Sequence, residues 1–198
     1  MKTYSLKWCI ISMPLIFKCY RCSDCCTFTD PGDYPKVFPW EKRSLEKKAI
    51  KYGIGELKFI PEIMYYDPFS KKYIVLLYRW VIGNKCPFNK ELKCTIHGDH
   101  PLSCKMYPLI VNYSDHTLRV GLQCNWIRDH FNMITRGINP KQVFPKEFEY
   151  AIKAFTVISL MIKDAERYGW KQIERDKLLS IKNYIDYDVF VEGDVSES

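Results

Sequence analysis

The sequence predicts an α+β protein with a small cysteine-rich core of short strands and a hairpin, followed by a helical C-terminal region. Three observations lead to this prediction. Apolar runs rich in β-branched and aromatic residues occupy the first two thirds of the chain. The last third instead places its apolar residues at helical spacing. Four of the nine cysteines lie within eight positions, which is unusual for an ordinary soluble domain.

One helix and several strands are expected in the first two thirds. Residues 40–52 have a helical pattern, and Gly53 follows as the residue that ends the helix. Residues 56–69 contain two prolines and are expected to form a loop, with a possible short strand over residues 57–60. A short hairpin is expected between Cys86 and Cys94. The other strand patterns span residues 8–17, 71–82, 109–113 and 117–122.

The last third of the chain is expected to be helical, with helices over residues 124–136, 145–168 and 171–185. Beyond about residue 186 the sequence is acidic, and we expect this tail to fray. We therefore divide the chain into a cysteine-cluster domain over residues 1–137 and a helical extension over residues 138–198 that packs on it.

The composition is that of a folded protein. Hydrophobic residues make up 47% of the chain and aromatic residues 15%, which excludes a disordered chain. The net charge of +7 permits nucleic-acid binding, but basic and aromatic residues do not interleave at a fixed spacing, so no nucleic-acid signal is present. The apolar runs are too short to cross a membrane and no signal-peptide cleavage site follows them. We expect a soluble, cytoplasmic protein.

The strongest chemical signal is the run Cys19-x2-Cys22-x2-Cys25-Cys26. Two intervening residues let the chain fold back so that both sulfurs point at one centre. The first three cysteines reproduce the C-x2-C-x2-C run that wraps an iron–sulfur cluster. Adjacent side chains generally point apart, so one member of the final pair serves a second centre or packs inside the protein. The remaining thiol ligands are expected from Cys86, Cys94 and Cys104.

Other interpretations of these residues remain open. One alternative is that the cysteines form disulfides, but an odd count and close crowding suit disulfides poorly, and thiols stay reduced in the cytosol. His97 and His100 are alternative ligands, although a loop histidine near a metal more often supports the ligands from outside. Cys9 and Cys124 also fit the role of a small buried hydrophobe.

The cysteine run after Phe17-Lys18, then Cys86, and the segment Cys94-Thr95-Ile96-His97-x3-Pro101-x2-Cys104-Lys105-x-Tyr107-Pro108 resemble the YkgJ-type cysteine-cluster family over about residues 16–125. That family is described as a candidate zinc- or iron-chelating domain, and flagellin-lysine N-methylases carry a similar cysteine pattern. The family usually has arginine where this chain has His100, and often an aromatic residue at His97, so an arginine contact to an anion or substrate is in doubt. The metal ligands implied by the resemblance are Cys19, Cys22, Cys25, Cys26, Cys86, Cys94, Cys104 and, further downstream, Cys124.

These observations predict a metal-chelating cysteine-cluster protein. An iron–sulfur cluster of the 4Fe–4S type is favoured because the thiolates outnumber the four that one zinc ion needs, and zinc is the alternative. Two other functions stay open: an iron–sulfur-dependent enzyme similar to protein-lysine methyltransferases, and a zinc-stabilised adaptor. Both would have a protein as substrate or partner. The sequence does not predict catalytic residues or the oligomeric state.

Overall fold

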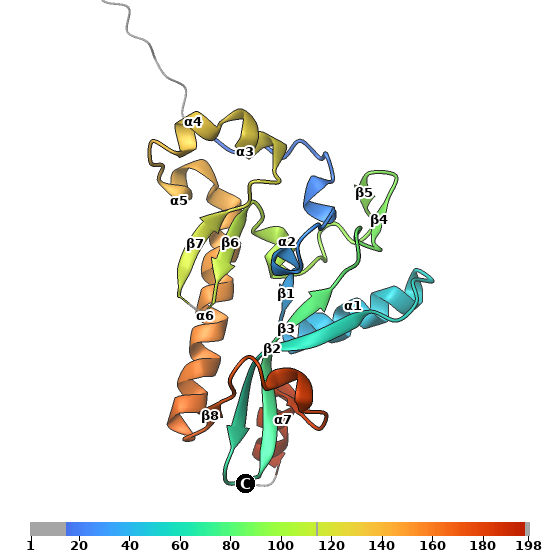
Figure 1. The fold of residues 1–198 in the computed structure, drawn as a ribbon, viewed down its shortest axis with the longest axis vertical. Helices are drawn as coiled ribbons and strands as arrows, with labels where there is room; N and C mark the ends of the chain where they lie inside the picture. The colour runs from blue at the N-terminus through green and yellow to red at the C-terminus, as the bar shows by residue number, and fades with distance from the viewer. Residues whose placement is uncertain (1–14, 114, 197–198) are drawn as a thin grey trace, which may run out of the picture.

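The computed structural model describes residues 15–113 and 115–196 and combines helices with small, mainly antiparallel sheets (Figure 1). The α+β prediction is confirmed. The α-helices are α1 (Pro39–Lys51), α2 (Leu102–Lys105), α3 (Asn125–Asp129), α4 (Phe131–Ile134), α5 (Pro140–Val143), α6 (Pro145–Arg167) and α7 (Tyr187–Ser196). The strands are β1 (Lys36–Val37), β2 (Lys58–Asp67), β3 (Lys72–Val81), β4 (Asn89–Lys90), β5 (Lys93–Cys94), β6 (Leu109–Asn112), β7 (Thr117–Val120), β8 (Lys171–Gln172) and β9 (Ile185–Asp186). Short 3-10 helices are η1 (Asp24–Cys26), η2 (Pro31–Asp33) and η3 (Leu178–Ser180).

The long antiparallel hairpin β2–β3 is the centre of the largest sheet. The strand order is β1-β3-β2-β8, and β9 also pairs with β3. The β3–β9 pair is parallel, and the other pairs are antiparallel. The turn of the hairpin is closed by Asp67, whose carboxylate accepts hydrogen bonds from the backbone N–H groups of Phe69 and Ser70 at 3.0 and 3.1 Å. The strand predicted over residues 71–82 is confirmed as β3, and the strands predicted over 109–113 and 117–122 are confirmed as β6 and β7.

The expectation of a loop over residues 56–69 is wrong, because β2 runs through most of it. Pro61 lies opposite Tyr78, and the pairing register shifts immediately afterwards, between Pro61 and Ile63. Proline is tolerated at such an irregularity because its missing N–H falls where the hydrogen-bond ladder is already interrupted. Pro61 therefore marks a bulge within the strand rather than its end.

The helices predicted over residues 40–52 and 145–168 are confirmed as α1 and α6. Each is followed by a glycine in the left-handed conformation, Gly53 with φ 62° and Gly169 with φ 69°. The single helix expected over residues 124–136 is wrong in part, because α3 and α4 are separate helices that meet at His130. The backbone of His130, with φ −110° and ψ 14°, departs from helical geometry and divides the two.

The helix expected over residues 171–185 is wrong. This segment forms β8, η3 and β9 and follows the sheet. The backbone N–H of Ile173 donates to the carbonyl of Met64 at 2.9 Å, and Leu178 is buried in the core. Contacts with β2 therefore override the local helical pattern, which is a weak preference by comparison.

The expectation of a frayed tail beyond residue 186 is also wrong, because α7 packs on the body of the protein. Phe190 is buried, and its ring meets the ring of Trp170 edge to face at 5.3 Å. The guanidinium of Arg43 on α1 pairs with Asp186 at 2.7 Å and also with Asp188. The acidic residues of this segment thus bind a basic residue of α1.

Two hydrophobic cores lie on either side of β3. Leu76 belongs to the core formed with α6, and Trp80 belongs to the core formed with α1. The first core combines Leu109 of β6 with Ile158 of α6. Residues before and after position 137 therefore share one interior.

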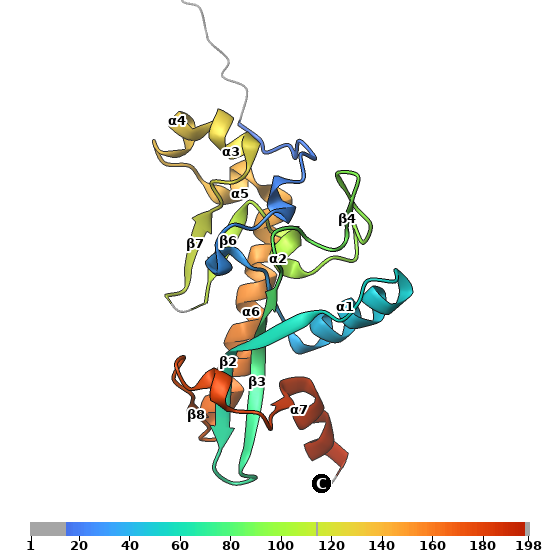
Figure 2. The same cartoon turned by 45° about the vertical axis from the view of Figure 1, so that its right-hand side comes forward.

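The cysteine-bearing segments lie toward one end of the molecule. Figures 1 and 2 show α6 running alongside the hairpin, with α3, α4 and α5 at one end of the protein and α7 at the other. In both views the first cysteine run, in blue, passes between α3 and the β4–β5 hairpin.

Most of the strand expected over residues 8–17, together with Cys9, lies outside the described residues. Residues 15–17 form no strand, and the backbone N–H of Phe17 donates to the carbonyl of Val143 at 2.7 Å. Within residues 15–113 and 115–196, no helix has both the length and the apolar character needed to cross a bilayer.

Candidate metal centre

The first cysteine run forms a tight loop that ends in η1. Arg21 and Ser23 have φ angles of 56° and 66°, in the left-handed region that reverses the chain over a few residues. The backbone N–H of Cys26 donates to the carbonyl of Ser23 at 2.9 Å, and the backbone N–H of Arg21 donates to Cys19 Sγ at 3.4 Å. The two-residue spacing between cysteines thus produces the compact turn that thiol ligands require.

Backbone hydrogen bonds attach this loop to the segment that carries Cys86. Thr27 and Lys85 form an antiparallel bridge. On one side of the bridge the backbone N–H of Cys86 donates to the carbonyl of Cys26 at 2.8 Å, and on the other the N–H of Phe28 donates to the carbonyl of Asn84, also at 2.8 Å. Cys26 and Cys86, far apart in the sequence, are therefore held beside each other by the backbone.

The β4–β5 hairpin brings Cys94 to the same place. Asn89 lies opposite Cys94 in this hairpin, and its backbone N–H donates to the carbonyl of Cys86 at 3.0 Å. The hydroxyl of Ser23 donates to the carbonyl of Leu92 at 2.8 Å, so the first loop also contacts the hairpin tip. The predicted hairpin between Cys86 and Cys94 is confirmed.

Cys104 is positioned by α2, which is fixed to α1 through Glu41. One carboxylate oxygen of Glu41 accepts a hydrogen bond from the backbone N–H of Leu102 at 2.7 Å, and the other accepts from the N–H of Phe38 at 3.0 Å. Burial raises the pKa of Glu41, partly offset by these two backbone bonds. A single carboxylate thus joins the starts of both helices.

Four cysteines share one environment, which we call the inner group: Cys26, Cys86, Cys94 and Cys104. Hydrogen bonds from the thiols of Cys25 and Cys86 lower the pKa of Cys26, and the same bonds raise the pKa of each donor. Burial raises the pKa of Cys94 and of Cys104, and the negative charge of Cys26 adds to both shifts. Cys26 is therefore the thiol of this group that ionises most readily.

Three further cysteines, which we call the outer group, lie near the start of α3: Cys19, Cys22 and Cys124. Burial raises the pKa of Cys124, and the proximity of Cys22 and Cys19 adds to that effect. Arg128 of α3 pairs with Asp24 of the first loop at 3.3 Å. Asp24 lies between Cys22 and Cys25, so this ion pair joins the first loop to α3, the helix that follows Cys124.

The eight cysteines within residues 15–113 and 115–196 are free thiols. Across the same described residues, no three Cys, His, Asp or Glu side chains are arranged to hold one metal ion as they stand. The backbone nevertheless places Cys26 beside Cys86, through the hydrogen bond from the N–H of Cys86 to the carbonyl of Cys26 at 2.8 Å. The fold therefore gathers the cysteine-bearing segments, and closing a site would require rotation of the thiol side chains.

Several buried polar groups beside the cysteines have no partner in hydrogen-bonding geometry. Asn89 is 8% exposed and both of its amide atoms are unpartnered, yet its amide contributes to the lowered pKa of Cys26. Ser103 Oγ, next to Cys104, and the Tyr107 hydroxyl are also buried without a partner. A buried donor left unsatisfied costs about 1–3 kcal/mol. These donors fit an anionic thiolate–metal group, and an all-sulfur ligand set suits zinc or iron.

Sequence reasoning missed the role of these polar residues. Asn89 and Ser103 carried one weak signal, their positions close to Cys86 and Cys104 in the sequence. The hydroxyl of Tyr107 faces the outer group, since burial raises its pKa and the charges of Cys124, Cys25 and Cys22 add to the shift.

His97 and His100 lie at the margin of the inner group. Their rings stack with centroids 5.1 Å apart, and the backbone N–H of Gly98 donates to Nδ1 of His100 at 3.1 Å. Burial lowers the pKa of His100 to about 4, and the nearby His97 and Lys105 add to the effect. His100 is therefore neutral at physiological pH and keeps its proton on Nε2, which makes this nitrogen a hydrogen-bond donor.

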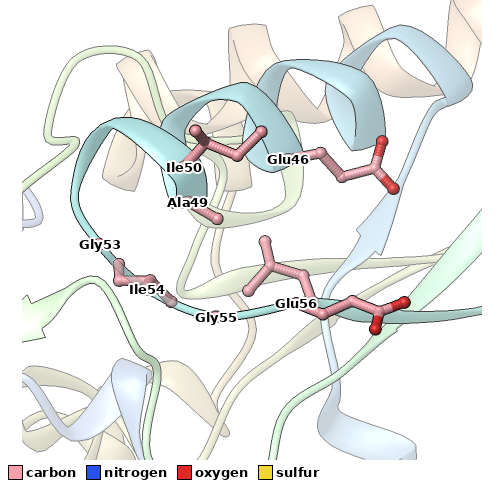
Figure 3. Close-up of a pocket in the computed structure, with 8 residues that line it drawn as sticks. Glu46, Ala49, Ile50, Gly53, Ile54, Gly55 and Glu56 are labelled. Carbon is pink, nitrogen blue, oxygen red and sulfur yellow. The ribbon is translucent and has the colours of Figure 1, made fainter.

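A surface hollow of about 600 Å³ lies elsewhere, between the C-terminal end of α1 and the segment that leads into β2 (Figure 3). Its walls are apolar at Ala49, Ile50 and Ile54, and Figure 3 shows the carboxylates of Glu46 and Glu56 at one end. None of its lining residues is a cysteine or a histidine, so the hollow is separate from the thiols.

The fold and its thiols define a cysteine-cluster protein, in which loops from distant parts of the sequence bring cysteines together. Within that class, residues 18–128 match the CxxCxxCC family, whose description is "Putative zinc- or iron-chelating domain", and the chain belongs to this family. The resemblance based on the cysteine spacing is thereby confirmed. No similar protein was found among proteins with curated descriptions or among solved structures.

Proposed function

We propose that the protein chelates iron as an iron–sulfur cluster of the 4Fe–4S type through its cysteine thiolates. The observation that carries this proposal is the juxtaposition of Cys26 and Cys86, which joins the first cysteine run to the central part of the chain. The buried, unpartnered amide of Asn89 lies beside that junction, since the backbone N–H of Asn89 donates to the carbonyl of Cys86. Membership in a family described as zinc- or iron-chelating supports metal binding itself.

Iron–sulfur chemistry is favoured over zinc because of the donor set. The eight candidate ligands are all thiols, and they outnumber the four that one zinc ion takes. A bound cluster would supply reversible electron transfer, at a potential set by hydrogen bonds to its sulfurs. Zinc is the alternative, and it would act as a structural cross-link between the first loop and the β4–β5 segment.

Purification without oxygen or chelator, followed by elemental analysis and visible spectroscopy, tests this proposal. We expect iron and inorganic sulfide in similar amounts and a brown protein. A colourless protein that contains zinc would favour the zinc site over the iron–sulfur cluster. A protein that contains neither iron nor zinc would overturn chelation. Cys86→Ser should release metal, whereas Cys9→Ser is the matched control and should retain it.

A cytoplasmic location is part of the proposal, because reducing conditions keep thiols available for metal. The two other functions, lysine methyl transfer and a protein-binding adaptor, stay predictions. Incubation of the metal-loaded protein with a methyl donor and cell extract tests the first of these. Failure to bind the donor or to transfer a methyl group would argue against it.

A further inference from the structure

We propose that the cysteines form two separate metal centres, placed side by side. The inner centre uses the inner group, Cys26, Cys86, Cys94 and Cys104. The outer centre uses the outer group, Cys19, Cys22 and Cys124, with Cys25 as its fourth ligand. This inference rests on the proposed function, because it divides between two centres the thiolates that the preceding proposal assigns to metal.

The number of thiols supports this division. A structural zinc ion and a 4Fe–4S cluster each take four protein thiolates in their common closed forms. The eight cysteines of the described residues are free, and the segments that carry them lie toward one end of the molecule (Figure 1). A single centre would leave four thiols unused beside it, whereas two centres use all eight.

The inner thiols are connected by a continuous set of backbone contacts. Cys86 donates its N–H to the carbonyl of Cys26 at 2.8 Å, and Asn89 donates to the carbonyl of Cys86 at 3.0 Å. Asn89 then pairs with Cys94 across the hairpin. Each of the four inner cysteines is half-buried, which suits a closed centre shielded from solvent.

The outer thiols depend on a different set of contacts, which join residues of the first loop and of η2 to the residues around α3. Arg128 pairs with Asp24 at 3.3 Å, and the amide of Gln123 donates to Asp33 at 3.2 Å. These contacts flank Cys124 on both sides in the sequence and attach its segment to η2 and to the loop that carries the other outer thiols.

The adjacent pair Cys25-Cys26 is where the two centres meet. Cys25 is exposed, as is Cys19 of the outer group, whereas Cys26 is half-buried among the inner thiols. The two neighbouring side chains thus differ in exposure to solvent. A division between them gives each centre four sulfurs.

Metal counts on matched variants test the inference. Native mass spectrometry of the anaerobically purified protein should show two zinc ions or two clusters per chain. Cys124→Ser and Cys86→Ser should each lose one centre and retain the other, and the double variant should lose both. Cys9→Ser should retain both, and far-UV circular dichroism should show that each variant keeps the helix content of the wild type.

The outcomes separate this inference from the proposed function. A wild-type protein without metal would overturn both. One centre per chain, lost equally in the two single variants, would overturn the division and leave chelation intact. If a variant does not fold, metal release from the wild type tests the inference instead. A thiol reagent should free metal in two phases of equal size, because Cys19 and Cys25 of the outer centre are exposed whereas the inner thiols are half-buried. A single phase would refute two centres.

Discussion

Replacement of Asp186 by alanine should destabilise the protein at the end remote from the cysteines. Asp186 follows Ile185 in β9, where the chain enters α7. Its carboxylate accepts a hydrogen bond from the Tyr78 hydroxyl at 2.5 Å and one from Arg43 Nη1 at 2.7 Å. Tyr78 is 1% exposed, so the substitution would leave its hydroxyl without its charged partner at a buried position.

The size of the effect follows from the two bonds. A hydrogen bond to a charged group contributes about 1.5–3 kcal/mol. The substitution removes this bond and also leaves the buried Tyr78 hydroxyl without a partner, which adds to the cost. The Arg43 pair adds little, because its side chain is 37% exposed and an exposed ion pair is worth about 0–1 kcal/mol. We therefore expect Asp186→Ala to lower the free energy of unfolding by about 2–4 kcal/mol.

Urea denaturation of a matched set of variants measures this effect. Asp188→Ala is the control, since Asp188 contacts the same Arg43 but not Tyr78, and it should cost less than about 1 kcal/mol. In the background of Tyr78→Phe the cost of Asp186→Ala should fall by more than about 1 kcal/mol, because no hydroxyl is then left unpaired. Equal costs for the two aspartates, or no change in the Tyr78→Phe background, would refute the reasoning.

Three further predictions concern other parts of the fold. The pKa of Asp67 is lowered, because the hydrogen bonds of its turn outweigh the effect of burial. The free energy of unfolding should therefore fall as the pH drops below about 4, and Asp67→Asn should flatten this acid dependence of the melting temperature. Gly121→Ala should cost about 1–3 kcal/mol in urea denaturation, because the new Cβ would lie 2.7 Å from the ring of Tyr107, whereas Gly83→Ala meets nothing within 4 Å and should cost far less. Phe190→Ala should cost about 3–5 kcal/mol by the same measurement, and an unchanged midpoint would show that α7 does not pack on the core.

Local pattern predicted the elements whose burial follows a simple period. The apolar spacing of α6 and the continuous apolar run of β3 were both sufficient, because each element contacts the core along its whole length. The pattern failed at β2, where Pro61 falls on a bulge, and over residues 171–185. In the second case the partner of Ile173 is Met64, and no local signal records a contact between residues so distant in the sequence.

The candidate site shows the same limit. Spacing alone predicted that Cys19, Cys22 and Cys25 belong to a folded loop, since two residues between cysteines fix the turn. It did not predict that Cys26 meets Cys86 through backbone pairing, or that the amide of Asn89 is buried there without a partner. These features depend on which segments become neighbours, and that is decided by the hairpin and the two cores.

The contacts that hold the first cysteine loop determine how much a bound metal would add to stability. In small zinc domains the metal supplies the folding free energy, because little else orders the ligand loops. Here the first loop is fixed by the bridge between Thr27 and Lys85, and by the bond from Ser23 to the hairpin carbonyl of Leu92. Part of the conformational entropy of the ligands is therefore lost on folding and not on metal binding. It follows that the two hydrophobic cores stabilise the protein without metal, and that a bound metal would mainly fix the thiol rotamers of the loops around it.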